Sequence, residues 1–253
     1  MNNWTLGPGH LGDAVWSLTA LRHIDAPHTF YCPVEYHRNL EAICEDRDIK
    51  LMPMDQATAD ARCTWIGNMR FAHKGVAWAM QRDVLGFLCA WSSELALEAG
   101  QPKMFVKHDL LCDWPAINRP VHDVPEFDAL VINARPLSGQ CPRWDEGEMD
   151  QLIAQIAVKN RVVCTNQTTA SGPNITVVDK TISEIGSLSL RAQFIVAVST
   201  GAAVCVHNVF DRTIPTFIFL DDPLKILWDD KEIVQHGLVL QGMLPELQSH
   251  NLI

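Results

Sequence analysis

The stretch WTLGPGHLGDAVWSLTALRHI, residues 4–24, decides the fold class. It begins with a short run that can form a strand, and a loop with glycines at 7, 9 and 12 follows. Apolar residues then recur at helical spacing as far as Ile24, which predicts an amphipathic helix beginning near Asp13. A strand, a glycine-rich loop and a helix in this order are typical of a parallel α/β sheet.

The same alternation continues along the chain. Further strands are expected at 28–34, 49–54, 62–68, 129–136, 161–166, 174–179, 193–200 and 214–220. Helices are expected at 35–47, 74–100, 143–160, 181–192, 201–210 and 224–234, with a last strand and a tail from 238. The pattern predicts βαβ units with parallel sheets.

A proline-rich stretch interrupts this alternation. Residues 112–128, CDWPAINRPVHDVPEFD, have no clear period, and we interpret them as a linker between two halves. The predicted domains are residues 1–118 and 119–253, each with the same βαβ character.

Composition excludes several classes of protein. The 253 residues carry 20 basic and 30 acidic side chains, a formal net charge of −10, and no basic patch stands out, so no nucleic-acid partner is expected. No apolar run is long enough to cross a bilayer, and the polar N-terminus does not resemble a secretory signal. The eight cysteines include no C-x-x-C pair, which indicates thiols in the reducing cytoplasm and no metal site.

The glycine loop allows two interpretations. Gly7, Gly9 and Gly12 have the G-x-G-x-x-G spacing of a dinucleotide-binding turn, and Glu35 stands near the place of the acidic residue that binds the ribose. On that interpretation the protein is an NAD(P)-dependent oxidoreductase. Alternatively, the loop presents Asp13, either as a helix-capping carboxylate or as a catalytic base.

The residues around Asp13 resemble the start of the heptosyltransferases, glycosyltransferase family 9. Those proteins have a strand, a Gly-Asp pair and a helix with a Pro-Ala-Leu-basic motif, where this chain has Gly12-Asp13 and Thr19-Ala20-Leu21-Arg22. The second half resembles the family at Ser199-Thr200-Gly201, at Ile214-Pro215 and at Arg143-Trp144.

This resemblance implies a GT-B-like α/β fold, in which two Rossmann-like lobes with parallel sheets face each other across a cleft. It implies transfer of a sugar from a nucleotide-diphosphate sugar, the co-substrate, to a glycan acceptor, as in lipopolysaccharide biosynthesis. The acceptor would bring peripheral membrane contact, and no metal or other cofactor is expected. The implied site residues are Asp13 as catalytic base; Gly9, His10 and Gly12 in the acceptor-side loop; and Arg135, Arg143, Ser199, Thr200 and Gly201 around the donor.

The sequence departs from the family pattern near the donor residues. Ser199 and Val204 occupy places where the family usually has Asp and His. These departures favour an alternative in which the protein is a non-catalytic GT-B-like protein that binds a nucleotide sugar or a glycan.

Overall fold

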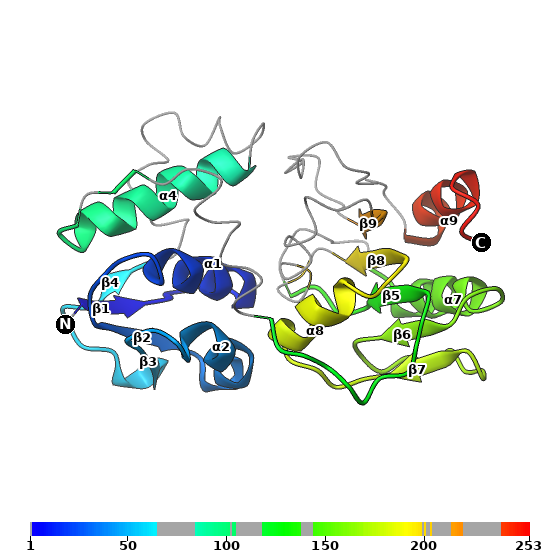
Figure 1. Ribbon diagram of the computed structural model, residues 1–253, viewed down its shortest axis with the longest axis horizontal. Helices are drawn as coiled ribbons and strands as arrows, with labels where there is room; N and C mark the ends of the chain where they lie inside the picture. The colour runs from blue at the N-terminus through cyan, green and yellow to red at the C-terminus, as the bar shows by residue number, and fades with distance from the viewer. Residues whose placement is uncertain are drawn as a thin grey trace. The chain divides into compact units, whose positions relative to one another are not determined.

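The computed structural model describes residues 2–64, 84–101, 103–104, 118–137, 144–198, 200, 203, 214–219 and 239–253. The chain divides into two compact units, Met1–Asn118 and Arg119–Ile253. Each unit is built on a parallel sheet (Figure 1).

The first unit contains a sheet with the strand order β3-β2-β1-β4, in which every pair is parallel. Its strands are β1 (Asn2–Thr5), β2 (His28–Cys32), β3 (Ile49–Pro53) and β4 (Arg62–Cys63). Its helices are α1 (Leu11–Leu21), α2 (His37–Cys44) and α4 (Val84–Glu98), with short 3-10 turns η1 (Val34–Tyr36) and η2 (Met54–Gln56). Helix α1 contacts both α2 and α4.

Helix α1 begins at Leu11, earlier than the predicted start near Asp13. His10 is extended and caps the helix, while the Asp13 carboxylate accepts a hydrogen bond from the His10 backbone N–H. Gly12 therefore lies inside the first turn of the helix, and the loop itself contains only Gly7 and Gly9 of the predicted glycines.

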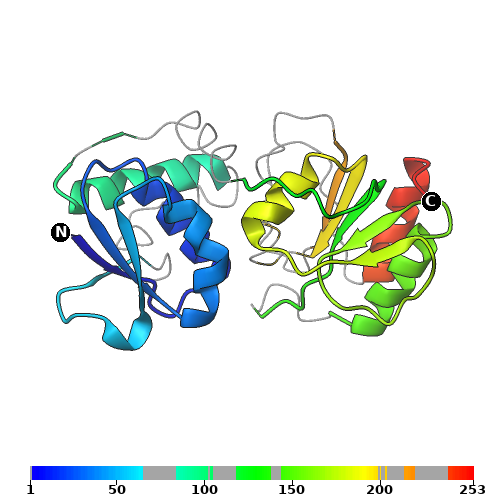
Figure 2. The same cartoon turned by 60° about the horizontal axis from the view of Figure 1, so that its bottom comes forward.

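The second unit contains a sheet with the strand order β7-β6-β5-β8-β9, again entirely parallel. Its strands are β5 (Ala129–Ile132), β6 (Val162–Cys164), β7 (Ile175–Val177), β8 (Phe194–Val198) and β9 (Thr216–Phe219). Its helices are α7 (Glu146–Ile156), α8 (Ile182–Ser189) and α9 (Val239–Ser249). Figure 2 shows α8 on one face of this sheet and α7 and α9 on the other, so both faces are covered, as a parallel sheet requires.

The predicted α/β class with parallel sheets is confirmed.

The strand order reverses once in each unit. The second and third strands of each sheet lie successively on one side of the unit's first strand, and the next strand pairs with the other side of that first strand. This reversal places a topological switch point between β1 and β4 in the first unit and between β5 and β8 in the second. Ligands of open α/β sheets bind outside the carboxyl ends of the strands at such points.

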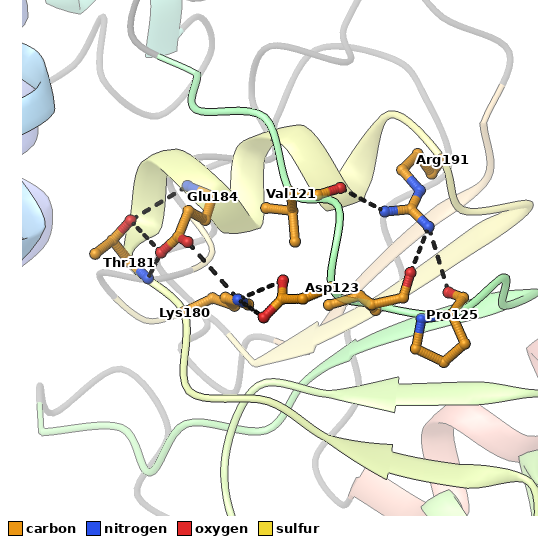
Figure 3. A network of polar contacts seen from close by, with 8 residues as sticks. Val121, Asp123, Pro125, Lys180, Thr181, Glu184 and Arg191 are labelled. Atoms are coloured by element: carbon orange, nitrogen blue, oxygen red, sulfur yellow. Dashed lines mark hydrogen bonds and ion pairs between the residues drawn. The ribbon is translucent and has the colours of Figure 1, made fainter.

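The boundary between the two units falls within residues 112–128, which we interpreted as a linker, but the residues after the boundary belong to the second unit. Residues 119–127, which we call the strap, lie along α8 of the second unit (Figure 3). Val121, Val124 and Phe127 are buried, which explains why the stretch lacks a helical or strand period: its apolar residues serve an extended segment.

Arg191 holds the strap on the second unit. Its guanidinium donates hydrogen bonds to the carbonyl oxygens of Val121 (3.1 Å), Val124 (2.9 Å) and Pro125 (3.3 Å) (Figure 3). The three carbonyls belong to no sheet, so these hydrogen bonds come from a side chain and not from a strand ladder.

The C-terminal segment also differs from the sequence-based expectation. Residues 239–249 form helix α9, where we expected a strand. Met243 and Leu247, one helical turn apart, are buried against the core of the second unit. Their spacing fits a helix period, which the apolar run before them had obscured.

Arg22 connects the C-terminal ends of α1 and α2. Its side chain has no exposed surface, and Nη1 lies 2.5 Å from both the Ile43 carbonyl oxygen and Asp46 Oδ1. Nη2 donates a second hydrogen bond to Asp46 Oδ2 at 3.0 Å. A buried guanidinium with a bidentate carboxylate and a helix-end carbonyl fixes the two helices relative to each other.

We expect Arg22→Ala to lower the free energy of unfolding by about 2–4 kcal/mol, because it removes buried packing and leaves the Ile43 carbonyl without its donor. The matched control is Arg47→Ala, since Arg47 is 45% exposed and lies 4.0 Å from the same Asp46. Its effect should stay below about 0.5 kcal/mol. Urea unfolding followed by circular dichroism measures the free energy of unfolding of both variants. Equal losses of stability would contradict the role of Arg22 in connecting α1 and α2.

His28 is a buried neutral histidine at the start of β2. Trp4 Nε1–H donates to His28 Nδ1 at 3.0 Å, and His28 Nε2 lies 3.2 Å from the Ile24 carbonyl oxygen. Nδ1 is thus the acceptor and Nε2 the donor, a pattern that only the neutral ring can satisfy. Burial lowers the pKa of His28, and the hydrogen bond to Ile24 offsets this only in part.

We expect this site to make the protein less stable as the pH falls below about 6.5, the ordinary histidine value. Below that pH the unfolded chain gains a proton that folded His28 resists. In His28→Asn the amide oxygen can still accept from Trp4, but the residue does not titrate. Between pH 7.5 and 5, the Tm of the wild type should fall more steeply than the Tm of His28→Asn. Parallel curves of Tm against pH would refute the assignment of His28 as a buried neutral histidine.

Candidate functional site

The glycine loop brings α1 to the carboxyl end of β1. Gly7 has a φ of +65°, a left-handed conformation that favours glycine, and it starts the turn after the strand. Gly9 is buried, whereas His10 is exposed. The loop therefore packs its backbone against the unit and presents a histidine side chain to solvent.

Asp13 lies in the first turn of α1, half-buried at this edge. Its Oδ2 accepts a hydrogen bond of 2.7 Å from the His10 N–H. Burial raises the pKa of Asp13, while that hydrogen bond and the charge of His10 act in the opposite direction. A carboxyl group with a raised pKa is a stronger base when ionised, so the position suits proton abstraction as well as capping.

The backbone of Asp13 is tied to the far side of the switch point. Ser17 Oγ–H donates to the Asp13 carbonyl oxygen at 2.7 Å, and Ser17 Oγ lies 3.0 Å from Thr64 Oγ1. Thr64 follows β4, and its N–H donates to the Thr5 carbonyl of β1 at 2.8 Å. Sequence analysis missed Ser17 and Thr64; the available signal was a serine one helical turn after Asp13.

Tyr36 is a third residue that sequence analysis missed at this edge. It ends η1, directly beyond β2. Burial raises the pKa of the Tyr36 phenol, and the negative charges of Glu35 and Asp13 raise it further, so the phenol lies within electrostatic range of both carboxylates. Beyond β2, the edge around Asp13 is therefore acidic and aromatic.

This acidic edge disfavours the dinucleotide interpretation. Glu35 does lie beyond the end of β2, where a ribose-binding carboxylate belongs. However, the His10 N–H at the start of α1, which would face a pyrophosphate, is occupied by the Asp13 carboxylate. A carboxylate and a diphosphate repel each other at the same helix end.

Two of the predicted donor residues, Arg135 and Thr200, follow the strands on either side of the switch point of the second unit. Arg135 is exposed in the segment after β5, and Thr200 follows β8. Thr200 Oγ1 is buried and has no hydrogen-bond partner among the residues that the structure describes. Arg143, Ser199 and Gly201 lie outside the described residues, as does Val204.

The second edge holds two buried polar residues that the sequence did not single out. Asn133, immediately after β5, is 6% exposed, and Thr165, immediately after β6, is 7% exposed. The Asn133 amide is fully engaged with the loop after β6, whereas Thr165 Oγ1 has no partner within the described ranges. The sequence alone did not identify these two residues as part of a site, because Asn and Thr are common in ordinary turns after a strand.

The N-terminus of α7 is not a free anion site. Asp145 caps the helix by accepting from the Glu148 N–H at 2.8 Å, and Glu146 and Glu148 add negative charge to the first turn. Trp144 packs against the core of the second unit. The first turn of α7 therefore disfavours an anion.

No group of three potential metal ligands comes together among the described residues. The sequence does contain a D-x-D spacing at Asp46 and Asp48. These residues precede β3 at the amino edge of the first sheet, where Asp46 is engaged by Arg22. Within the same described ranges, no helix is both long and apolar enough to cross a membrane.

No known protein family matches the sequence, and no curated protein matches it. Solved structures do match the fold. The E. coli heptosyltransferase WaaC with ADP is 13% identical, with a TM-score of 0.56 over 99% of this chain and 98% of that chain. WaaC with ADP-2-deoxy-2-fluoro heptose is 12% identical, with a TM-score of 0.57 over 99% of this chain and 100% of the other. The predicted GT-B-like fold and its likeness to heptosyltransferases are thereby confirmed at the level of the fold.

Proposed function

We propose that the protein is a glycosyltransferase that moves a sugar from a nucleotide-diphosphate sugar to a glycan acceptor. One observation carries this proposal: in a chain with the heptosyltransferase fold, a half-buried carboxylate, Asp13, is fixed at the switch point of the first sheet. Its raised pKa and fixed geometry suit a base.

In the proposed reaction, Asp13 accepts the proton of an acceptor hydroxyl. The hydroxyl oxygen forms a bond to the anomeric carbon of the donor sugar, and the bond from that carbon to the diphosphate oxygen breaks. The nucleoside diphosphate leaves with the electron pair. Because the His10 N–H holds Oδ2, Oδ1 is the oxygen that faces the acceptor hydroxyl.

The leaving diphosphate needs positive charge and hydrogen-bond donors. We assign these to Arg135, Arg143 and the turn Ser199–Gly201, because strand ends at a switch point are where open α/β sheets bind ligands. Arg135 is exposed and able to reach a ligand, and the Thr200 hydroxyl has no competing partner among the described residues. On this assignment the arginines, rather than a metal, neutralise the diphosphate.

The acceptor would be held by the first unit, 1–118, through Gly9 and His10 before α1 and Gly12 in its first turn. We infer a glycan of the bacterial envelope, as in lipopolysaccharide biosynthesis, with the enzyme in the cytoplasm and in peripheral contact with the membrane through its acceptor. This choice of acceptor class follows from the sequence resemblance to the heptosyltransferases.

We expect Asp13→Asn to lower kcat by about 10²–10⁴-fold, the usual contribution of a general base, with little change in donor binding. The matched control is Glu184→Gln. Glu184 occupies the corresponding position in α8, where its carboxylate accepts from the Thr181 N–H at 2.8 Å. If Asp13 only caps α1, Asp13→Asn should lower activity no more than Glu184→Gln does. Equal activities of the two variants would therefore show that Asp13 is not the catalytic base.

The pH dependence gives a second test of Asp13. Because burial raises its pKa, kcat/KM should fall on acidification at a pH above the ordinary aspartate value of 3.8. The protonated acid cannot accept the acceptor's proton, so the rate is lost as pH decreases through the raised pKa. A rate that stays level down to pH 4 would contradict the assignment.

The donor is tested by thermal unfolding with ADP-, GDP- and UDP-sugars and with NAD and NADP. A ligand that binds only the folded protein raises its Tm. We expect one nucleotide-sugar class to raise the Tm, and Arg135→Ala or Arg143→Ala, but not Asp13→Asn, to reduce that shift. A shift with NAD alone would instead support the oxidoreductase alternative.

The alternative of a non-catalytic binding protein rests on Ser199 and Val204, which replace the usual Asp and His of the family. It predicts that a nucleotide sugar raises the Tm while no product forms with any acceptor. Slow hydrolysis of the donor, measured as release of nucleoside diphosphate, would distinguish a transferase without its acceptor from such a binding protein.

A further inference from the structure

We propose that Asn133 is a positioning residue that shapes residues 165–169, here called the β6 loop, to recognise the nucleoside part of the donor. This inference rests on the proposed function, because it assumes that a nucleoside diphosphate binds at the carboxyl edge of the second sheet. It assigns a role to a buried amide and a buried hydroxyl that the transfer reaction does not otherwise use.

Asn133 uses its whole amide group to hold the β6 loop. Nδ2 donates to the carbonyl oxygens of Asn166 (3.1 Å) and Gln167 (3.2 Å), while Oδ1 accepts from the Asn166 N–H (2.9 Å). Only an amide offers two donors and an acceptor in this arrangement. Beyond the ends of β5 and β6, these side-chain hydrogen bonds take the place of the backbone hydrogen bonds between the strands. They therefore fix the backbone of the β6 loop.

Asp150 of α7 holds the other end of the β6 loop. Its carboxylate accepts from the Thr169 N–H at 3.0 Å and from the hydroxyls of Thr168 and Thr169. Burial raises the pKa of Asp150, but these hydrogen bonds outweigh burial and leave the pKa below its ordinary value. The loop is thus held from two sides, with a negative charge at one of its ends.

The loop leaves one buried group available to a ligand. The Thr165 hydroxyl has no partner among the described residues, although Thr165 is only 7% exposed. A hydroxyl buried without a partner costs free energy, and a bound ligand would recover it. The side chains of Asn166 and Gln167 are exposed beside it, so the loop offers further uncharged donors and acceptors.

These groups favour the nucleoside over the diphosphate. The β6 loop contains no lysine or arginine, and the Asp150 carboxylate repels a phosphate. Hydroxyls, amides and backbone groups match the hydroxyls of a ribose or the edge of a base. The diphosphate then remains with Arg135 and the turn after β8.

Asn160 provides a matched control within the same unit. Its Nδ2 also donates to two backbone carbonyls, those of Ile156 (3.1 Å) and Leu252 (2.8 Å). It precedes β6, at the opposite edge of the sheet from Asn133. Asn133→Ala and Asn160→Ala therefore both remove side-chain hydrogen bonds to backbone carbonyls, but only the first changes the β6 loop.

The test is calorimetric titration of the wild type, Asn133→Ala and Asn160→Ala with ADP, GDP, UDP and inorganic pyrophosphate. For the nucleotide that binds the wild type best, we expect Asn133→Ala to weaken binding about tenfold or more, which corresponds to about 1.4 kcal/mol. The affinity of Asn133→Ala for pyrophosphate should stay within about twofold of the wild-type value. Asn160→Ala should bind both the nucleotide and pyrophosphate within about twofold of the wild type. Thr165→Val should weaken nucleotide binding several-fold while the β6 loop keeps its hydrogen bonds.

Each result decides the inference. Equal nucleotide affinities for Asn133→Ala and Asn160→Ala would show that Asn133 is merely structural, and equal losses for nucleotide and pyrophosphate would show that the loop does not recognise the nucleoside. Either result overturns the inference and leaves the proposed function intact. A wild type that binds no nucleotide overturns both. If Asn133→Ala does not fold, Thr165→Val decides: unchanged nucleotide affinity overturns the inference.

Discussion

Parallel strand pairing is the constraint on which the rest of this structure depends. Parallel neighbours cannot be joined by a tight turn, so every crossover must travel back along the sheet, usually as a helix. All strands then end at the same edge, and the residues that follow them are brought together whatever their separation in the sequence. Ser17 of α1, which follows β1, meets Thr64 after β4 in this way, and Asn133 meets the β6 loop.

The two edges created by this constraint differ in chemistry. The first edge holds a half-buried carboxylate with a raised pKa beside a tyrosine whose pKa is also raised. The second edge holds a buried amide, threonine hydroxyls and an exposed arginine. A base needs the first environment, and a ligand rich in hydroxyls and phosphates needs the second. The proposed division of labour between acceptor and donor follows from this difference in chemistry.

Several features were predictable because they depend on local sequence alone. The strands β1, β2, β3 and β5 were each recognised as short runs that can form strands, and α7 and α8 as helical segments. The start of α1 was misplaced because its cap is a histidine in an extended conformation, which has no strong sequence signature. Asp13 itself could be singled out, since it follows the glycine loop and the resemblance to heptosyltransferases includes it.

The strap, α9 and the β6 loop required the tertiary structure. The strap is fixed by Arg191, which is distant in sequence, and α9 is stabilised as a helix by packing Met243 and Leu247 on the core. By itself, the sequence determined the α/β class, the parallel sheets and the position of Asp13 at the first helix. Only the tertiary structure decided which polar residues surround each edge, because those contacts join strand ends that are remote in the chain and leave no period or motif in it.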